Sequence, residues 1–184
     1  MPAAATGVRL SALRRILFAH DFRRSLHEMS DLELTVNGTK RRISAPEATP
    51  LIYVLHNELG LTGSRYGCGL EQCGSCMVLV DGEPVFSCTR EVGTLAGRSV
   101  TTIEALGTAD HLHPLQQAFI DEQAGQCGYC LSGIIVEAKA LLDKNPAPSR
   151  TEIVAALDRH ICRCGAHQRI VRAVERAAKA MSKP

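Results

Sequence analysis

Three cysteines in one short, glycine-rich stretch constrain this chain more than any other feature. Residues 66–76 read Tyr-Gly-Cys-Gly-Leu-Glu-Gln-Cys-Gly-Ser-Cys, a C-x4-C-x2-C spacing, and a fourth cysteine comes after a short strand-like segment. The four are Cys68, Cys73, Cys76 and Cys88. Thiols grouped in this way are typical of a metal site, and the chain on both sides must fold so as to bring them together.

The spacing is the ligand layout of a plant-type two-iron two-sulfur (2Fe-2S) ferredoxin site. Gly67, Gly69 and Gly74 flank the ligands, where the missing Cβ allows tight bends and brings backbone N–H groups close to the cluster sulfurs. Such donors stabilise the reduced, more negative state of a cluster. The alternative is a zinc site, but zinc sites favour two C-x2-C pairs.

The remaining cysteines form a second set, in which a C-x2-C pair is followed further along by a C-x-C pair. Residues at i and i+2 point to opposite sides of a helix, so the C-x-C pair can share a site only from a turn or a helix start. Helical pattern resumes after Gly165, where free amides and the helix dipole suit an anionic cluster. Alone, this set fits zinc or iron–sulfur; together the sets use all eight cysteines, which favours a second redox cluster. Its members are Cys127, Cys130, Cys162 and Cys164.

Composition argues against several other classes of protein. The formal net charge is +2, but residues 1–28 carry five arginines against two acidic residues, so the rest is close to neutral. Nothing indicates nucleic-acid binding, which needs a clustered basic face with interleaved aromatics. Residues 12–19 contain a twin arginine but too few apolar residues for an export signal, and no run is long enough to span a membrane. We expect cytoplasmic assembly, although a partner could place the complex in the periplasm or at a membrane.

Three segments differ in character. Residues 1–28 have weak helical periodicity unrelated to the patterns in the rest of the chain, and we interpret them as a dispensable extension or the product of a start codon upstream of the true one; a targeting or docking helix is the alternative. Residues 29–106 contain strand patterns around the first cysteine set. Residues 107–184 are helical throughout and contain the second set.

Residues 29–106 are predicted to form a small mixed sheet crossed by one helix. Asn37-Gly38 and Asp81-Gly82 predict hairpin turns, because these residues tolerate the positive φ of a tight turn. The expected strands are residues 32–36, 40–44, 77–80, 85–87 and 99–103. This is a β-grasp arrangement, the fold of plant-type ferredoxins.

Capping residues and periodicity predict the helices. One is expected to begin at Pro50, with Thr49 as its cap, between the first hairpin and the cysteine loop. In the C-terminal segment, Ser149 and Glu152 form a capping box at the start of another. The other helical spans are 114–123, 131–144 and a stretch around 170–178. Four short helices joined by tight loops predict a small four-helix bundle.

Together these motifs resemble the small iron–sulfur subunit of the xanthine oxidase family of molybdenum hydroxylases. The resemblance rests on both cysteine sets in this order, with Gln126 directly before Cys127 and Gly165 directly after Cys164, and it covers roughly residues 29–184. The chain is similar in particular to the small subunits of isoquinoline 1-oxidoreductase and related bacterial aldehyde dehydrogenases.

The resemblance implies an α+β protein, with an N-terminal β-grasp 2Fe-2S ferredoxin-like domain followed by an all-α four-helix-bundle 2Fe-2S domain. It also implies a large partner subunit that carries a molybdenum–molybdopterin cofactor. The cluster held by Cys127, Cys130, Cys162 and Cys164 would be the one nearest the molybdenum. Gln126 matches a glutamine whose side chain contacts the pterin; a plain surface amide is the alternative.

The expected function is electron transfer within a molybdenum hydroxylase or dehydrogenase that oxidises an aldehyde or an N-heterocycle. Electrons would pass from the molybdenum centre through the second-set cluster and then the first-set cluster to an acceptor. No dinucleotide-binding fingerprint is present, so the acceptor would lie elsewhere, on a flavin subunit or, as the resemblance implies, a cytochrome c or membrane carrier. No substrate chemistry is expected on this chain. Two alternatives stay open: a free-standing two-cluster ferredoxin, and a zinc-stapled interaction module.

Overall fold

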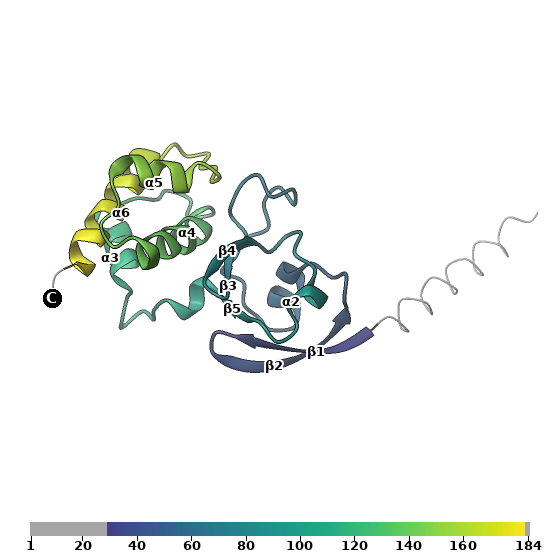
Figure 1. The fold of residues 1–184 in the computed structure, drawn as a ribbon. Helices are drawn as coiled ribbons and strands as arrows, with labels where there is room; N and C mark the ends of the chain where they lie inside the picture. Colours follow the sequence, from purple (N-terminus) through teal and green to yellow (C-terminus); the bar gives the residue numbers. More distant parts are fainter. Residues whose placement is uncertain (1–28, 183–184) are drawn as a thin grey trace, which may run out of the picture.

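A five-stranded sheet lies between one short helix and a group of four longer helices in the computed structural model, which describes residues 29–182 (Figure 1). The predictions for residues 1–28 lie outside the described residues. The strands are β1 (Met29–Val36), β2 (Thr39–Pro46), β3 (Met77–Val80), β4 (Glu83–Phe86) and β5 (Ser99–Thr101). The helices are α2 (Leu51–Asn57), α3 (Pro114–Asp121), α4 (Leu131–Lys144), α5 (Arg150–Leu157) and α6 (His167–Met181), with 3-10 turns η1 (Val92–Leu95) and η2 (Ile103–Ala105). The α+β prediction is confirmed.

The sheet has the order β2-β1-β5-β3-β4, with β1 and β5 parallel and the other neighbours antiparallel. Both predicted hairpin turns are present. Asn37 and Gly38 have φ of 52° and 74°, and Asp81 and Gly82 have φ of 50° and 84°. The outer hairpin is longer than the alternating pattern suggested, because β1 and β2 pair along their full eight residues.

Helix α2 begins one residue later than predicted, and Thr49 does not cap it. Pro50 is the N-cap, in an extended conformation with φ −60° and ψ 134°, and no side chain of the described residues caps the helix. The reason is that this stretch is held by backbone pairing. The Thr49 carbonyl accepts from the Val92 amide at 2.9 Å, and the Leu51 amide donates to the Arg90 carbonyl at 2.8 Å.

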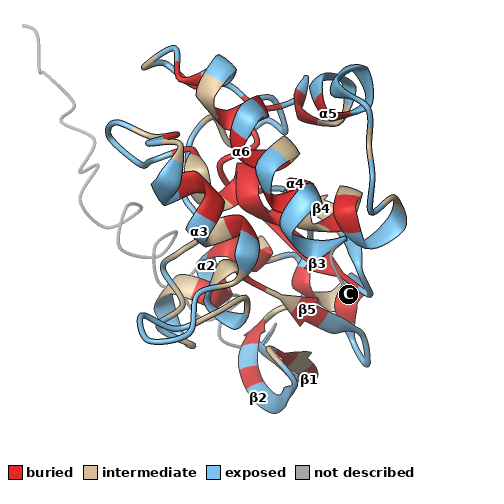
Figure 2. Cartoon of the chain, turned by 90° about the vertical axis from the view of Figure 1, so that its left-hand side faces the viewer, coloured by how far each residue is buried: buried red, intermediate tan, exposed pale blue. Residues whose placement is uncertain are grey.

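Strand β3 is buried at all four positions, because each face of the sheet is covered by a different helix. Val78 and Val80 belong to the core beneath α2. Met77 and Leu79 point the other way and pack against Val136 of α4. In Figure 2, buried residues accordingly gather along β3 and α4. The sheet and the helical part are therefore joined by direct apolar packing.

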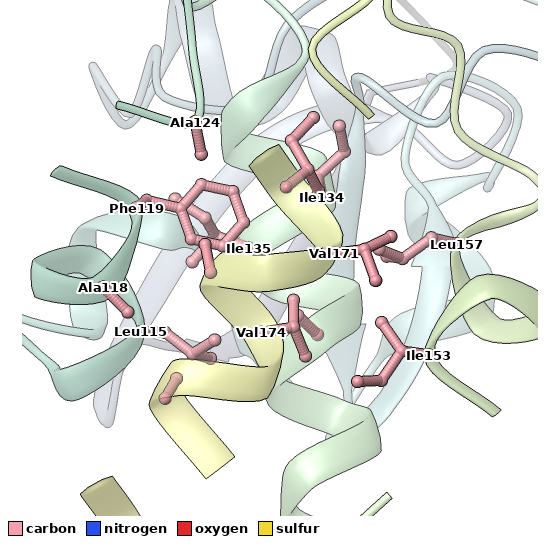
Figure 3. Close-up of a cluster of buried hydrophobic side chains, with 14 of the residues drawn as sticks. Leu115, Ala118, Phe119, Ala124, Ile134, Ile135, Ile153, Leu157, Val171 and Val174 are labelled. Atoms are coloured by element: carbon pink, nitrogen blue, oxygen red, sulfur yellow. The ribbon is translucent and has the colours of Figure 1, made fainter. Parts of the chain in front are cut away.

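Helices α3 to α6 share a second apolar core, shown in Figure 3. Its larger members include Leu115, Phe119, Ile134, Ile135, Ile153, Leu157, Val171 and Val174. The predicted bounds of α4 are confirmed, and so is the Ser149–Glu152 capping box of α5. Helix α3 ends at Asp121, two residues before its predicted end. Among the described residues, no helix has both the length and the apolar character that a membrane crossing requires.

Candidate metal centres

The first cysteine set is assembled by the β3–β4 hairpin and the loop before it. Cys68, Cys73 and Cys76 lie between α2 and β3, and Cys88 comes shortly after β4. Because Met77 pairs with Phe86 in the hairpin, Cys76 and Cys88 are brought side by side, and both are buried. Burial and the nearby Cys88 raise the pKa of Cys76 to about 12.

Backbone amides surround the sulfur of Cys68. The amides of Leu70 and Gln72 each donate to Cys68 Sγ at 3.3 Å, and the Cys68 amide donates to Cys73 Sγ at 3.4 Å. Desolvation opposes ionisation of Cys68, but hydrogen bonds from the amides of Leu70, Gln72 and Cys73 and from the Cys73 side chain outweigh it and lower the pKa of Cys68 to about 7. Amide donors are expected here from the glycine-rich sequence. In the structure, two of the three donors to these sulfurs, Cys68 and Leu70, directly adjoin a glycine, whereas Gln72 does not.

The flanking glycines are needed for the backbone conformation and close packing of the loop. Gly69 and Gly74 have φ of 68° and 75°, in the left-handed region where a side chain is disfavoured. Gly67 serves by its small size, since an added Cβ would lie 2.5 Å from Cys73 Sγ. The glycine-rich loop thus forms a cradle that closes tightly on its thiols.

The second cysteine set lies at the N-terminal ends of two helices, as predicted. Cys130 is the N-cap of α4, and burial raises its pKa to about 12. Cys162 and Cys164 lie just before α6. Desolvation opposes ionisation of Cys162, yet the amides of Ala166, Cys164 and Gly165, together with the Cys130 side chain, lower its pKa. Cys127 is exposed, and its Sγ lies 3.5 Å from that of Cys164.

The eight thiols approach one another two by two. Within residues 29–182, no three Cys, His, Asp or Glu side chains are arranged to hold a single metal ion. The contacting pairs are Cys68 with Cys73, Cys76 with Cys88, Cys127 with Cys164, and Cys130 with Cys162. Two pairs in each set match the donor chemistry of a 2Fe-2S group, whose irons are ligated by four thiolates in total. Binding would displace the thiol protons, because thiolates are the ligand form.

The two sets meet at a tight junction that the sequence did not predict. The Ile161 amide, next to Cys162, donates to the Cys73 carbonyl at 3.1 Å. Gly133 of α4 lies against Gly74, where an added Cβ would be 2.0 Å from the Gly74 carbonyl oxygen. An isolated glycine in an apolar helix pattern was the available signal for this contact.

His160 fills the same junction. It is 4% exposed, its ring stands against Gly74, and its Nε2 lies 3.3 Å from Glu137 Oε2. Arg159 lies 3.4 Å from the same carboxylate and places its guanidinium 4.6 Å from the centre of the Phe86 ring. These contacts connect α4 and the loop after α5 to the sheet. No sequence pattern indicated this role of His160.

A further contact joins the loops at the surface. The Tyr129 hydroxyl, between Cys127 and Cys130, donates to the Tyr66 carbonyl at 2.6 Å. Gln126, directly before Cys127, is exposed. Gln126 and Cys127 therefore stand where a partner could reach the second set.

Two family models match the chain, one for each cysteine set. Residues 34–99 match a 2Fe-2S iron-sulfur cluster binding domain, and residues 102–175 match a [2Fe-2S] binding domain. Each match contains one complete set of four cysteines.

The chain is also similar to curated proteins over most of its length. It is 51% identical to the A subunit of nicotinate dehydrogenase from Pseudomonas putida, over 83% of this chain and 98% of that protein. It is 49% identical to the alpha subunit of isoquinoline 1-oxidoreductase from Brevundimonas diminuta, over 80% of this chain and 97% of that protein.

Solved structures agree with these similarities. A chain of quinoline 2-oxidoreductase from Pseudomonas putida 86 is 34% identical with a TM-score of 0.80, over 83% of this chain and 96% of that one. Aldehyde oxidoreductase from Desulfovibrio gigas is 40% identical with a TM-score of 0.81, over 85% of this chain but 18% of that longer one. With its two 2Fe-2S binding domains, the chain belongs to the xanthine oxidase family of molybdenum hydroxylases, as an iron–sulfur subunit of a molybdenum-dependent oxidoreductase.

Proposed function

We propose that this chain is the electron-relay subunit of a molybdenum hydroxylase or dehydrogenase. A large partner subunit would oxidise the substrate, an N-heterocycle or an aldehyde, and this chain would carry the electrons away. Relatives named for nicotinate, isoquinoline and aldehyde oxidation support this substrate class. One 2Fe-2S cluster would be held by Cys68, Cys73, Cys76 and Cys88, and the other by Cys127, Cys130, Cys162 and Cys164. The pairwise approach of the thiols favours two-iron groups over zinc, which takes its four ligands around one point.

We assign the two sites to two domains. Residues 29–106 would form a β-grasp ferredoxin-like domain, which the sheet crossed by α2 supports. Residues 107–184 would form a four-helix-bundle domain, which the shared core of α3 to α6 supports.

The observation that carries the relay is the hydrogen bond from the Ile161 amide to the Cys73 carbonyl. A bound 2Fe-2S cluster takes up and releases one electron at a time. Cys73 belongs to the first set, and Ile161 is bonded directly to Cys162 of the second. One hydrogen bond and a few covalent bonds thus separate ligands of the two sites. This proximity favours electron transfer between them and supports a relay over two unrelated structural metal sites.

Exposure supports a direction for the relay. Cys127 and Gln126 are exposed and would face the molybdenum–molybdopterin cofactor of the partner, with the Gln126 amide contacting the pterin. Leu70, at the tip of the first cysteine loop, is 68% exposed. That loop would face the acceptor, which is a cytochrome c, a flavin subunit or a membrane carrier.

The complex purified from its native host tests this function. We expect about four irons per copy of this chain, and two distinct 2Fe-2S EPR signals that appear when an oxidisable N-heterocycle or aldehyde is added. Zinc in place of iron would contradict the proposal in favour of the zinc-stapled module. A fully loaded chain that purifies without any large subunit would favour the free-standing ferredoxin.

Replacing Gln126 with alanine should leave both clusters assembled and slow their reduction by substrate. Loss of one hydrogen bond is worth about 1 kcal/mol, which corresponds to a roughly fivefold slower rate. Stopped-flow absorbance of the complex measures it, with Gln117→Ala as the matched control, because Gln117 is an exposed glutamine on α3 whose side chain bonds to Asp121. Equal rates in both variants would remove the role proposed for Gln126.

A further inference from the structure

Glu71 occupies an unusual backbone position at the tip of the first cysteine loop. Its φ is 58°, in the left-handed region that non-glycine residues rarely adopt. It stands between Leu70 and Gln72, whose amides both donate to Cys68 Sγ. A left-handed residue between two such amides turns both N–H groups to one side, which is the geometry of an anion-binding nest.

The side chain of Glu71 contacts a second segment of the chain. Its carboxylate accepts a hydrogen bond from the Thr89 hydroxyl. Thr89 directly follows Cys88, so the bond ties the loop that supplies Cys68 to the segment that supplies the fourth ligand. The amides of Leu70 and Gln72 thus bond to the Cys68 sulfur, while the Glu71 side chain bonds to Thr89 in the segment after β4. We call this Glu71–Thr89 hydrogen bond the brace.

We propose that Glu71 is a positioning residue for the first cluster site: its bond to Thr89 holds the left-handed turn that aims the Leu70 and Gln72 amides at Cys68 Sγ. Amides that donate to a ligand sulfur favour the reduced state, so this brace raises the reduction potential of the site. The inference rests on the proposed two-cluster function. It adds a residue outside the ligand set that decides how readily the outward-facing site accepts an electron.

The charge and the brace have opposite effects on the potential, which makes them separable. The Glu71 carboxylate, taken as a charge alone, disfavours an added electron nearby, whereas the brace favours it by fixing the amides. Thr89→Val removes the brace and keeps the charge. Glu71→Gln keeps an oxygen that can accept from Thr89 and removes the charge. Thr89→Ser keeps both and serves as the matched control.

An EPR-monitored redox titration of the whole complex tests the proposal, with the second-set signal as an internal reference in each sample. In Thr89→Val we expect the reduced-to-oxidised ratio of the first site at a fixed potential to fall roughly tenfold, which is about 59 mV for a one-electron couple. Thr89→Ser should match the wild type. Glu71→Gln should match it or be slightly easier to reduce.

Several outcomes would overturn the proposal. An unchanged first-site potential in Thr89→Val would show that the brace does not position the amides. If Thr89→Val failed to retain its cluster, Glu71→Ala, which lacks both the charge and the bond to Thr89, would overturn the proposal by reducing its first site as readily as Glu71→Gln does. If the wild-type complex itself lacked two 2Fe-2S signals, the proposed function would fail first, and the two failures are therefore distinguishable.

Discussion

Replacing Cys127 with serine should remove one of the two 2Fe-2S signals and leave the other unchanged. A serine hydroxyl stays protonated at neutral pH, so the pair that Cys127 forms with Cys164, 3.5 Å away, would keep one thiolate. Cys127 is exposed and lies outside the junction that the Ile161 amide and the Cys73 carbonyl form between the two sets. Iron content should fall by about half, since four thiolates are needed for each cluster.

Cys162→Ser provides the matched comparison within the same site. Cys162 is buried and follows Ile161, whose amide bonds to the Cys73 carbonyl of the first set. We expect this variant to lose the second-set signal and also to shift the line shape or potential of the first. Iron analysis and EPR of dithionite-reduced complexes measure both effects. Loss of both signals in Cys127→Ser would contradict the prediction, because the two sites would then not assemble independently.

The local elements were predictable because their causes lie within a few residues of the sequence. Asn37-Gly38 and Asp81-Gly82 make hairpin turns because their backbones tolerate positive φ. Ser149 and Glu152 start α5 because they satisfy each other's backbone amides. The boundary error at Thr49 arose where pairing with residues 90–92 overrides a local capping signal.

The contacts between the two sets were not predictable in the same way. Periodicity indicates that a helix face is buried, but it does not identify what covers that face. Helix α4 buries one face in the helical core and another against β3. Glu137 of α4 and its partner His160 are therefore buried by contacts between segments that lie far apart in the sequence. The cysteine spacings identified which residues belong to each set, whereas the alignment of the sets depends on Gly133, His160 and Ile161.

Replacing Gly133 with alanine should destabilise the protein, although alanine is ordinarily better than glycine in a helix by about 1 kcal/mol. An added Cβ would lie 2.0 Å from the Gly74 carbonyl oxygen and 3.0 Å from its carbonyl carbon. These are backbone atoms of the first cysteine loop, so no side-chain rotation relieves the clash. Helix α4 would have to move away from the loop, and we expect a net loss of about 3 kcal/mol.

The consequence should reach both sites, because Gly74 directly follows Cys73 of the first set and Cys130 of the second set is the N-cap of the displaced helix. Ser132→Ala is the matched control in the same turn of α4: the Ser132 hydroxyl is buried and has no hydrogen-bond partner among residues 29–182, so its removal should be neutral or stabilising. Thermal unfolding and EPR of the two variants measure the difference. A Gly133→Ala variant with the wild-type unfolding midpoint and an unaltered first-set signal would show that α4 does not hold the loop in place.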